Sequence, residues 1–214
     1  MTLIVITQGV KVCNERKSRL DLVDQRLTHF VQYCGYLPVP IPNSLLFQVN
    51  DPDLRKIRLE VWLKNISPSG IILSGGANIG CYPDRDLIEN MLLDYAERRK
   101  IPVLGICRGM QVIASRAKGV LHKISGHVRS RHALKGRIKR KVNSFHNFSV
   151  KSLPKNFKVL ARSMDGEIEA IKHQNLPMEG WMWHPEREKD FVPQDVNRLK
   201  KLFSIGHDFK TLND

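Results

Sequence analysis

Apolar positions along the chain follow two alternating patterns: short uninterrupted runs, and longer segments in which they recur every three or four residues. The short runs are rich in isoleucine, valine and leucine, which is typical of buried strands, and they lie at 3–7, 70–73 and 102–106. The recurrence at helical spacing predicts helices, at 20–33, 54–63, 86–99 and 109–117. Strands that alternate with helices indicate parallel β-α-β units, so the first half of the chain is predicted to be α/β.

The pattern changes after Gly119, where strand-like segments predominate at 139–150, 158–162, 168–171 and 180–183. Residues 37–41 carry prolines at alternate positions and suit an edge strand, because proline donates no hydrogen bond to a neighbouring strand. A last helix is predicted over 194–203, and neither an internal repeat nor a low-complexity linker divides the chain. These patterns predict a single α/β domain over 1–214, with a three-layer, flavodoxin-like mixed sheet and helices on both faces.

The amino-acid composition favours a globular protein over a membrane or exported one. With 42% apolar and 26% charged residues, the chain is typical of a soluble globular domain. It contains no run of about 18 apolar residues, the length of a membrane helix, and its start lacks the basic and long apolar regions of an export signal. The four cysteines, at 13, 34, 81 and 107, form no Cys-x-x-Cys pair. We therefore expect free thiols in a cytoplasmic protein with no membrane partner.

The net charge of +14 is unevenly distributed. Residues 98–164 contain no Asp or Glu, yet they hold 18 of the 35 Lys and Arg residues. Such a field attracts phosphorylated substrates, nucleic acid or acidic lipid. A solubilising surface without a dedicated partner is the alternative interpretation. Because the basic stretch begins beside the candidate nucleophile described next, we favour an anionic substrate.

Residues 105–109, Gly-Ile-Cys-Arg-Gly, lie where a predicted strand runs directly into a helix. A nucleophile between glycines at such a junction is typical of hydrolases, because side chains at the glycines would collide with the neighbouring strand and helix. The N-terminal dipole of the helix favours the thiolate form of Cys107. The alternative is a small buried cysteine at the end of a strand.

A thiolate nucleophile also needs a base, and His184 is the candidate at the end of a later predicted strand. Pro185 is expected to turn the carboxylate of Glu186 back to one imidazole nitrogen, which leaves the other nitrogen for Cys107. A surface histidine beside a charged turn is the alternative. The two motifs together are more specific than either one alone.

Residues 73–78, Leu-Ser-Gly-Gly-Ala-Asn, follow another predicted buried strand. We expect the backbone N–H groups of Gly75, Gly76 and Arg108 to form an oxyanion hole, in which each donor contributes roughly 3 kcal/mol to transition-state stabilisation. A plain turn is the alternative. The segment is not a phosphate-binding loop, because the Gly-Lys-Ser/Thr ending is absent.

Together these motifs resemble the class I glutamine amidotransferases, and in particular their γ-glutamyl hydrolase branch, over almost the whole chain. The resemblance implies a triad of Cys107, His184 and Glu186 on a mixed α/β sheet, without a cofactor. It also implies a glutamyl-binding site, formed by Gln111 and by the backbone of Asn143, Ser144, Phe145 and His146. Residues 165–170, Asp-Gly-Glu-Ile-Glu-Ala, match a further signature of the branch with a structural or rim role.

The region after Gly119 departs from the family pattern, because it is short and very basic. Its charge favours a small-molecule γ-glutamyl substrate that carries phosphate groups. The resemblance to the γ-glutamyl hydrolase branch implies a nucleoside diphosphoramidate as the leaving group. Arg108, Arg129 and Arg131 are candidate phosphate contacts, since a guanidinium pairs with phosphate oxygens in two places. Alternatively, Arg108 braces the nucleophile and the other two arginines face solvent.

His122, His127 and His132 recur every five residues, the kind of spacing that raises the question of a metal site. No Asp, Glu or Cys lies near them in the sequence, and the neighbouring basic side chains repel cations. We therefore expect no metal site, because zinc prefers a denser set of ligands. The aromatic residues also do not alternate with basic ones as a nucleic-acid stacking surface requires.

Three hypotheses remain open. In the first, the protein is a stand-alone hydrolase that forms a glutamyl thioester on Cys107. In the second, it is a glutaminase subunit that passes ammonia to a synthetase partner, and its turnover depends on that partner. In the third, it is an inactive hydrolase fold that binds nucleic acid in a salt-dependent manner. We expect the first, with neither a synthetase nor a nucleic-acid partner.

Overall fold

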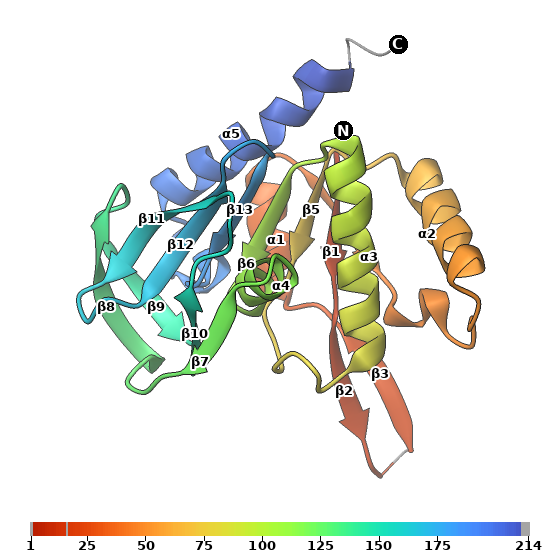
Figure 1. Cartoon of the computed structure of the whole chain (residues 1–214), viewed down its shortest axis with the longest axis horizontal. Helices are drawn as coiled ribbons and strands as arrows, with labels where there is room; N and C mark the ends of the chain where they lie inside the picture. Colours follow the sequence, from red (N-terminus) through yellow and green to blue (C-terminus); the bar gives the residue numbers. More distant parts are fainter. Residues whose placement is uncertain (1, 16, 211–214) are drawn as a thin grey trace.

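The computed structural model describes residues 2–15 and 17–210, without the side chains of 205–210. Its centre is a mixed sheet of nine of the strands found in these residues (Figure 1). In their order across the sheet they are β4 (Leu37–Ile41), β1 (Leu3–Thr7), β5 (Gly70–Leu73), β6 (Val103–Ile106), β13 (Met178–Trp181), β12 (Ile168–His173), β11 (Phe157–Ser163), β8 (Val128–Gly136) and β9 (Lys141–Phe145).

The two halves of the sheet differ in strand direction. Neighbouring strands are parallel from β4 to β13 and antiparallel from β13 to β9. Strands β6 and β13 lie at the join, with Gly105 opposite Gly180. Because they are parallel, their carboxyl ends meet at one edge of the sheet, which is where open α/β sheets bind ligands.

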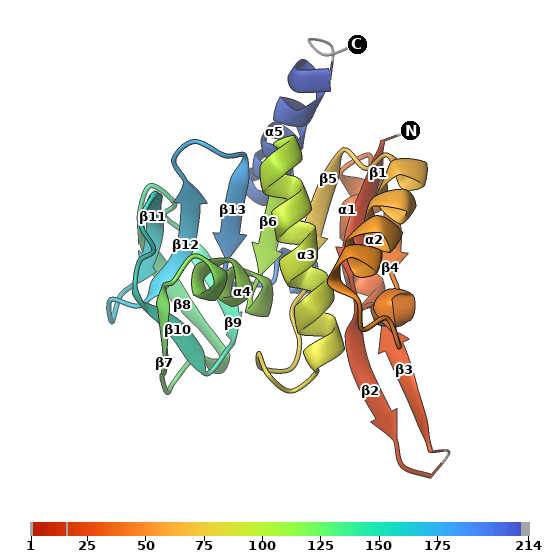
Figure 2. The same cartoon turned by 45° about the vertical axis from the view of Figure 1, so that its right-hand side comes forward.

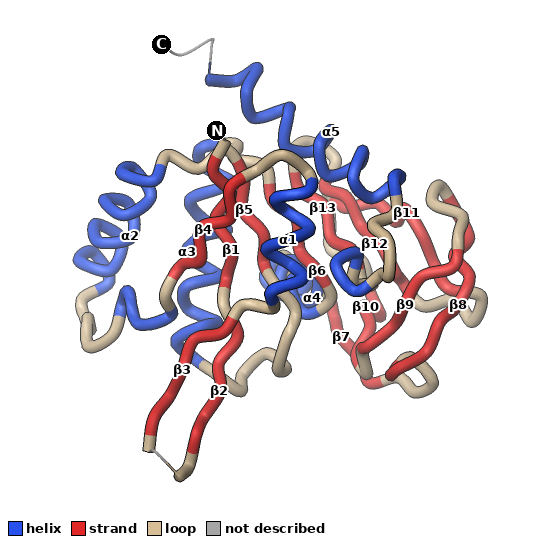
Figure 3. Tube along the Cα trace, turned by 180° about the vertical axis from the view of Figure 1, so that it is seen from behind, coloured by secondary structure: helices blue, strands red, loops and turns tan. Residues whose placement is uncertain are grey.

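Helices cover both faces of the sheet, as the apolar patterns predict (Figures 1 and 3). Helices α2 (Pro52–Ile66), α3 (Pro83–Arg99) and α4 (Arg108–Arg116) pack on one face, and α1 (Gln25–Tyr33) and α5 (Pro193–Lys210) pack on the other. Each face has its own apolar core, one around Leu63, Leu92 and Ile113 and the other around Phe30 and Phe203. The predicted three-layer α/β fold is therefore confirmed.

Two separate pairs of antiparallel strands, both containing strands that the sequence did not predict, accompany this framework. Strands β2 (Gly9–Cys13) and β3 (Ser18–Leu22) project beyond the end of the sheet (Figure 2). The helix expected from Leu20 was wrong at its start, because 18–22 pair with 9–13 and α1 begins only after Asp24. Asp24 caps that helix by accepting a hydrogen bond from the N–H of Arg26.

In the second pair, β7 (Val120–Lys123) and β10 (Phe148–Ser152) are antiparallel, with β8 and β9 between them in the chain. The strand expected over 139–150 is in fact divided between β9 and β10, with a turn at 146–147. Strands β7 and β8 were not predicted, because basic residues interrupt their apolar alternation. No helix in the described part of the chain is both long enough and apolar enough to cross a membrane.

Candidate active site

Cys107 lies at the junction between β6 and α4, in the position that the sequence predicted. Its backbone has φ 51° and ψ −106°, a conformation that L-residues rarely adopt and that is typical of strained functional sites. The residue is the N-cap of α4, so the unpaired N–H groups of the first helical turn lie beside it. All four cysteines are free thiols.

The glycines around Cys107 allow three elements to approach closely. A Cβ atom on Gly109 would lie 2.1 Å from the carbonyl oxygen of Leu73, at the end of β5. A Cβ atom on Gly105 would lie 2.5 Å from the carbonyl carbon of Gly109. Side chains at these two positions would therefore push α4 off the sheet, which is the collision expected from the sequence.

His184 and Glu186 are brought together at the end of β13. Pro185 begins a short 3₁₀ helix, Pro185–Arg187, and this turn places Oε1 of Glu186 2.6 Å from Nδ1 of His184. Burial alone would lower the pKa of His184, but its hydrogen bonds with Cys107 and Glu186 raise it to about 9. The imidazole is therefore held as a cation near neutral pH.

The loop after β5 lies against the imidazole. A Cβ atom on Gly75 would come within 2.7 Å of Cε1 of His184. The guanidinium of Arg85 donates hydrogen bonds to the carbonyl oxygens of Ser74 and Gly75, at 2.8 and 2.9 Å. Because the N–H of a trans peptide points opposite to its carbonyl, the N–H groups of Gly75 and Gly76 point away from Arg85.

A buried ion network supports this loop and the start of α4. Glu89 pairs with Arg85 at 2.9 Å and also with the side chain of Arg108, which contacts Asp86 as well. Thr7 donates a further hydrogen bond to Glu89, at 2.9 Å. The expectation that the Arg108 side chain contacts phosphate is therefore wrong, because its guanidinium is buried between two carboxylates. Its backbone N–H remains a candidate oxyanion donor.

The sequence analysis missed this network. The sequence feature that could have indicated it is the spacing of Arg85 and Glu89, because charges four residues apart share one face of a helix. On α3 that face also carries Ile88 and Leu92, which pack in the core.

Three of the predicted glutamyl-binding residues, Asn143, Phe145 and Gln111, make the following side-chain contacts. The Asn143 amide donates to the backbone carbonyl of His184 at 2.7 Å, and its oxygen accepts from the N–H of His184 at 2.9 Å. The ring of Phe145 meets the His184 ring edge-on, with 5.7 Å between centroids. The Gln111 amide donates to the carbonyl of Phe148 at 3.2 Å. Asn143 therefore orients the histidine, a role that the sequence did not indicate.

Two further residues of this segment point elsewhere. The hydroxyl of Ser144 donates to the carbonyl of His127 at 2.7 Å, and the ring of His146 is buried beside that of His127. Their side chains are therefore not directed at Cys107, and only their backbone is available for a substrate.

Arg129 and Arg131 both lie on β8 and are exposed. Arg131 is opposite Asn143 in the β8–β9 register, and its guanidinium pairs with Glu188 at 2.9 Å. The sequence analysis also missed Arg187, whose guanidinium lies 4.7 Å from the centre of the Phe145 ring. Positive charge therefore borders the site on the side of β8 and β9.

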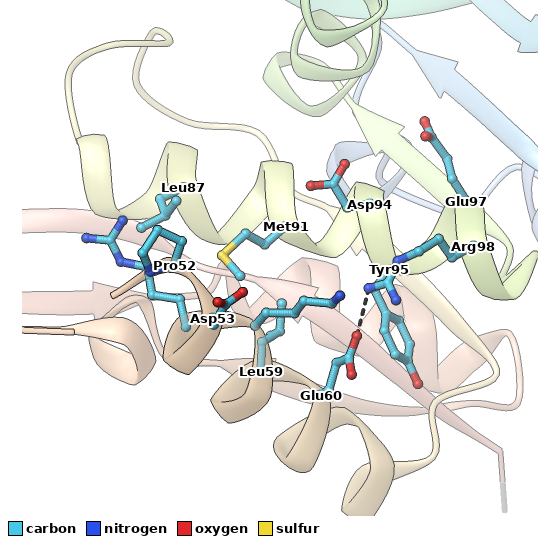
Figure 4. A pocket seen from close by; sticks show the side chains of 12 residues that line it. Pro52, Asp53, Leu59, Glu60, Leu87, Met91, Asp94, Tyr95, Glu97 and Arg98 are labelled. Carbon is cyan, nitrogen blue, oxygen red and sulfur yellow. Dashed lines mark hydrogen bonds and ion pairs between the residues drawn. The ribbon is translucent and has the colours of Figure 1, made fainter. Parts of the chain in front are cut away.

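Carboxylates from outside the basic stretch neutralise part of it. Arg98 pairs with Glu60, and Arg140 pairs with Asp195. Arg98 and Glu60 flank a pocket of about 540 Å³ between α2 and α3, which none of the predicted site residues lines (Figure 4). The basic stretch is therefore not one continuous cationic field.

Comparisons with known proteins agree with this architecture. A sequence model described as glutamine amidotransferase class-I matches residues 41–202. The chain is 35% identical over 141 residues to a γ-glutamyl-CDP-amidate hydrolase of Campylobacter jejuni, covering 63% of this chain and 70% of the relative. It is 38% identical over 150 residues to a subunit of the glutamine-hydrolyzing GMP synthase of Pyrococcus abyssi, covering 64% and 76%.

Among solved structures, a Thermoplasma acidophilum protein described as a candidate GMP synthase subunit superposes with a TM-score of 0.72. The alignment covers 99% of this chain and 97% of that one, at 19% identity. At this identity the likeness establishes the fold alone.

Proposed function

Because this chain belongs to the class I glutamine amidotransferase family, we propose that it hydrolyses a γ-glutamyl amide with Cys107 as nucleophile, His184 as base and Glu186 as orienter. One observation carries the proposal: Oε1 of Glu186 lies 2.6 Å from Nδ1 of His184, and the interactions of the imidazole with Cys107 and Glu186 raise its pKa to about 9 despite burial. A thiolate–imidazolium pair oriented by a carboxylate is the arrangement that nucleophilic cysteine hydrolases require. We further propose that 1–214 act as one hydrolase domain.

In the first half-reaction the Cys107 thiolate attacks the γ-carbonyl carbon and forms a carbon–sulfur bond. The carbonyl oxygen becomes an oxyanion, which accepts hydrogen bonds from the N–H groups of Gly75, Gly76 and Arg108. When the carbon–nitrogen bond breaks, the His184 imidazolium gives its proton to the leaving nitrogen. The amine departs and a glutamyl thioester remains on Cys107.

In the second half-reaction His184, now neutral, accepts a proton from water, and the resulting hydroxide attacks the thioester carbon. The carbon–sulfur bond breaks, glutamate leaves, and the thiolate is restored beside the imidazolium. The side chain of Gln111 and the backbone of 143–146 hold the glutamyl group while this occurs. Asn143 supports the reaction indirectly, because its amide hydrogen-bonds with both backbone groups of His184.

For the leaving group we propose a phosphorylated amine, with γ-glutamyl-CDP-amidate as the substrate and glutamate and cytidine diphosphoramidate as products. The Campylobacter jejuni relative bears the name of that activity. The exposed guanidinium groups of Arg129 and Arg131, on the strand next to β9, support phosphate recognition near the scissile amide.

A second function is favoured by a different observation, the similarity to the GMP synthase subunit of Pyrococcus abyssi. In this alternative the same triad hydrolyses glutamine, and the ammonia passes to a synthetase partner. The two functions differ in what the isolated chain does, because a glutaminase subunit depends on its partner.

Glutamate release separates the two functions. The purified protein alone is incubated with glutamine, an uncharged γ-glutamyl amide and γ-glutamyl-CDP-amidate. We expect turnover of the γ-glutamyl conjugates without a partner, no turnover by Cys107→Ala, and a glutamyl adduct on Cys107 by mass spectrometry. Cys81→Ala is the matched control, because Cys81 is an exposed free thiol and should leave turnover unchanged. A labelled Cys13, Cys34 or Cys81 would overturn the assignment of the nucleophile.

The triad itself is tested by combining substitutions. We expect His184→Ala to be nearly as damaging as Cys107→Ala, and Glu186→Gln to be less damaging, because an orienting group contributes less than the base. The double variant of Cys107 and His184 should be scarcely slower than either single variant, since the residues act as one unit. Losses that multiply in the double variant would contradict the triad.

A further inference from the structure

Three histidines and a glutamate that the proposed mechanism does not use converge in the antiparallel half of the molecule. We call them the histidine cluster: His127 and His132 on or just before β8, His146 in the turn between β9 and β10, and Glu169 on β12. Oε1 of Glu169 lies 3.3 Å from Nδ1 of His127, 3.2 Å from Nε2 of His132 and 3.4 Å from Nε2 of His146. One carboxylate oxygen therefore faces three imidazole nitrogens.

The outer contacts of two of these rings determine where their protons lie. Nε2 of His127 is 2.9 Å from a carboxylate oxygen of Asp165, and Nδ1 of His146 is 3.0 Å from the carbonyl oxygen of Phe148. Both partners are acceptors, so each outer nitrogen carries the hydrogen. The inner nitrogens, Nδ1 of His127 and Nε2 of His146, are then bare in the neutral rings, although they lie only 3.3 Å apart.

The remaining polar atoms of the cluster are also unsatisfied. Within the described residues, neither oxygen of Glu169 nor Nε2 of His132 has a partner with hydrogen-bond geometry. Glu169 is fully buried, and a buried carboxylate is costly unless charged or polar groups compensate it. The histidine nitrogens and this carboxylate oxygen thus converge on a space in which a positive charge is favourable.

The spacing of these atoms matches the coordination shell of zinc. Zn²⁺ binds histidine nitrogen and carboxylate oxygen at roughly 2.0–2.2 Å in a tetrahedral arrangement, so its ligand atoms lie roughly 3.4 Å from one another. Oε1 of Glu169 lies 3.2–3.3 Å from the nitrogens of His132 and His127, and the ligand atoms of these three residues all lie within 4.8 Å of one another, whereas His146 is outside this group. We propose that the histidine cluster binds one Zn²⁺ ion, through one nitrogen each of His127 and His132 and the carboxylate of Glu169.

The surroundings of the cluster have the features of a structural zinc site. Two nitrogen ligands favour zinc over Mg²⁺ or Ca²⁺, which prefer oxygen ligands. The Asp165 carboxylate orients His127, as outer partners of metal-bound histidines commonly do. The site is set among buried and half-buried side chains, and His146 lies against its glutamate, so the role we assign to the ion is to hold strands together.

The histidine cluster lies next to the proposed catalytic residues. It joins β8 to β12, and β12 pairs directly with β13, the strand that leads to His184. His146 lies against the cluster's glutamate and follows Phe145, whose ring packs on that of His184. The zinc ion therefore fixes the segment that borders the active site without entering the reaction.

The sequence argument against a metal site considered only ligands that are near one another in the sequence. Glu169 is 37 residues from His132 in the sequence, and antiparallel pairing brings them together. His122, by contrast, pairs with Glu167 at 2.9 Å and is not part of the cluster.

The test measures bound zinc in the full chain, purified without a histidine tag. The protein is stripped with a chelator, given Zn²⁺ alone, passed over a desalting column and analysed by elemental mass spectrometry. We expect one zinc per chain in the wild type and in His122→Ala, the matched control, but none in His132→Ala or Glu169→Gln. Asp165→Asn should retain the site with about 10- to 100-fold weaker affinity in chelator competition, because it removes only an orienting partner.

Wild-type protein alone provides a second measurement if a cluster variant fails to fold. Co²⁺ bound in place of zinc should show the intense visible absorption of a tetrahedral site, and zinc should raise the melting temperature of the stripped protein. A stripped wild type that retains no zinc, or zinc retention unaffected by His132→Ala, would overturn the proposal. The first result would mean that a shared proton, not a metal ion, neutralises the cluster.

Discussion

At the scale of single residues, the reactivity of the candidate site depends on how His184 is buried. Burial opposes a charged imidazole, yet the contacts with Cys107 and Glu186 are strong enough to raise its pKa to about 9. By contrast, Cys34 is buried without such partners, and burial raises the pKa of its thiol to about 12. We therefore predict that of these two buried cysteines only Cys107, beside the cationic imidazole, is reactive.

The raised pKa of His184 also predicts a pH dependence of stability. An unfolded histidine has a pKa of about 6.5, so the stabilisation from the charged form is complete below that pH and is lost as the pH rises towards 9. The free energy of unfolding should fall by up to about 3 kcal/mol over this range. Urea unfolding at several pH values measures the loss. His184→Gln should abolish this dependence, and His29→Gln, which changes an exposed histidine, should not.

At the scale of elements, the nucleophile depends on the close contact between α4 and the ends of β5 and β6. Gly105 and Gly109 have no side chains, so the first turn of α4 lies almost on the sheet and its free N–H groups reach the site. The buried network around Glu89 fixes α3 against the same turn, because it pairs with Arg85 and Arg108 together.

Gly109→Ala tests this contact. Its Cβ atom would lie 2.1 Å from the carbonyl oxygen of Leu73, so α4 must move. We expect a loss of roughly 1–3 kcal/mol in unfolding free energy, together with loss of turnover, because the nucleophile moves with the helix. Gly9→Ala is the control, since its Cβ atom would have an ordinary contact at 3.6 Å. Equal stability and activity in the two variants would show that the close approach is unimportant.

At the scale of the whole molecule, the net charge of +14 is less uniform than the sequence implies. Acidic residues from α2, α3 and α5 pair with arginines of the basic stretch. Arg129 and Arg131 are exposed on β8, and the ion pair of Arg131 with Glu188 leaves half of its side chain accessible. Exposed pairs of this kind contribute little free energy, so Arg131 is available to an anionic ligand.

This distribution predicts which arginines affect phosphorylated substrates. Arg129→Ala or Arg131→Ala should lower kcat/KM for γ-glutamyl-CDP-amidate about tenfold, the effect of losing one charge-assisted hydrogen bond. An uncharged γ-glutamyl amide should be unaffected, and the difference should shrink at high salt because of screening. Arg98→Ala is the control, since Arg98 pairs with Glu60 on α2. Equal losses on both substrates would argue against phosphate recognition and leave the γ-glutamyl chemistry in place.

The sequence by itself determined the features that depend on neighbouring residues. Apolar periodicity located β1, β5, β6 and the helices, and the glycines of 105–109 marked the strand-to-helix turn. Both signals depend only on residues that are close together in the sequence. The positions of catalytic candidates followed from the same local motifs, and their roles stay predictions until turnover is measured.

Only the tertiary structure decided what depends on strand pairing. The fold directs the Arg108 side chain toward a buried ion network and pairs 9–13 with 18–22, where a helix was expected from Leu20. It also brings the histidine cluster together around Glu169. Apart from the Arg85–Glu89 spacing on α3, the contacts of Arg108 and of the histidine cluster leave no signal in a short window of sequence. Antiparallel register and side-chain direction bring together residues that are tens of positions apart, and those distances exist only once the sheet has formed.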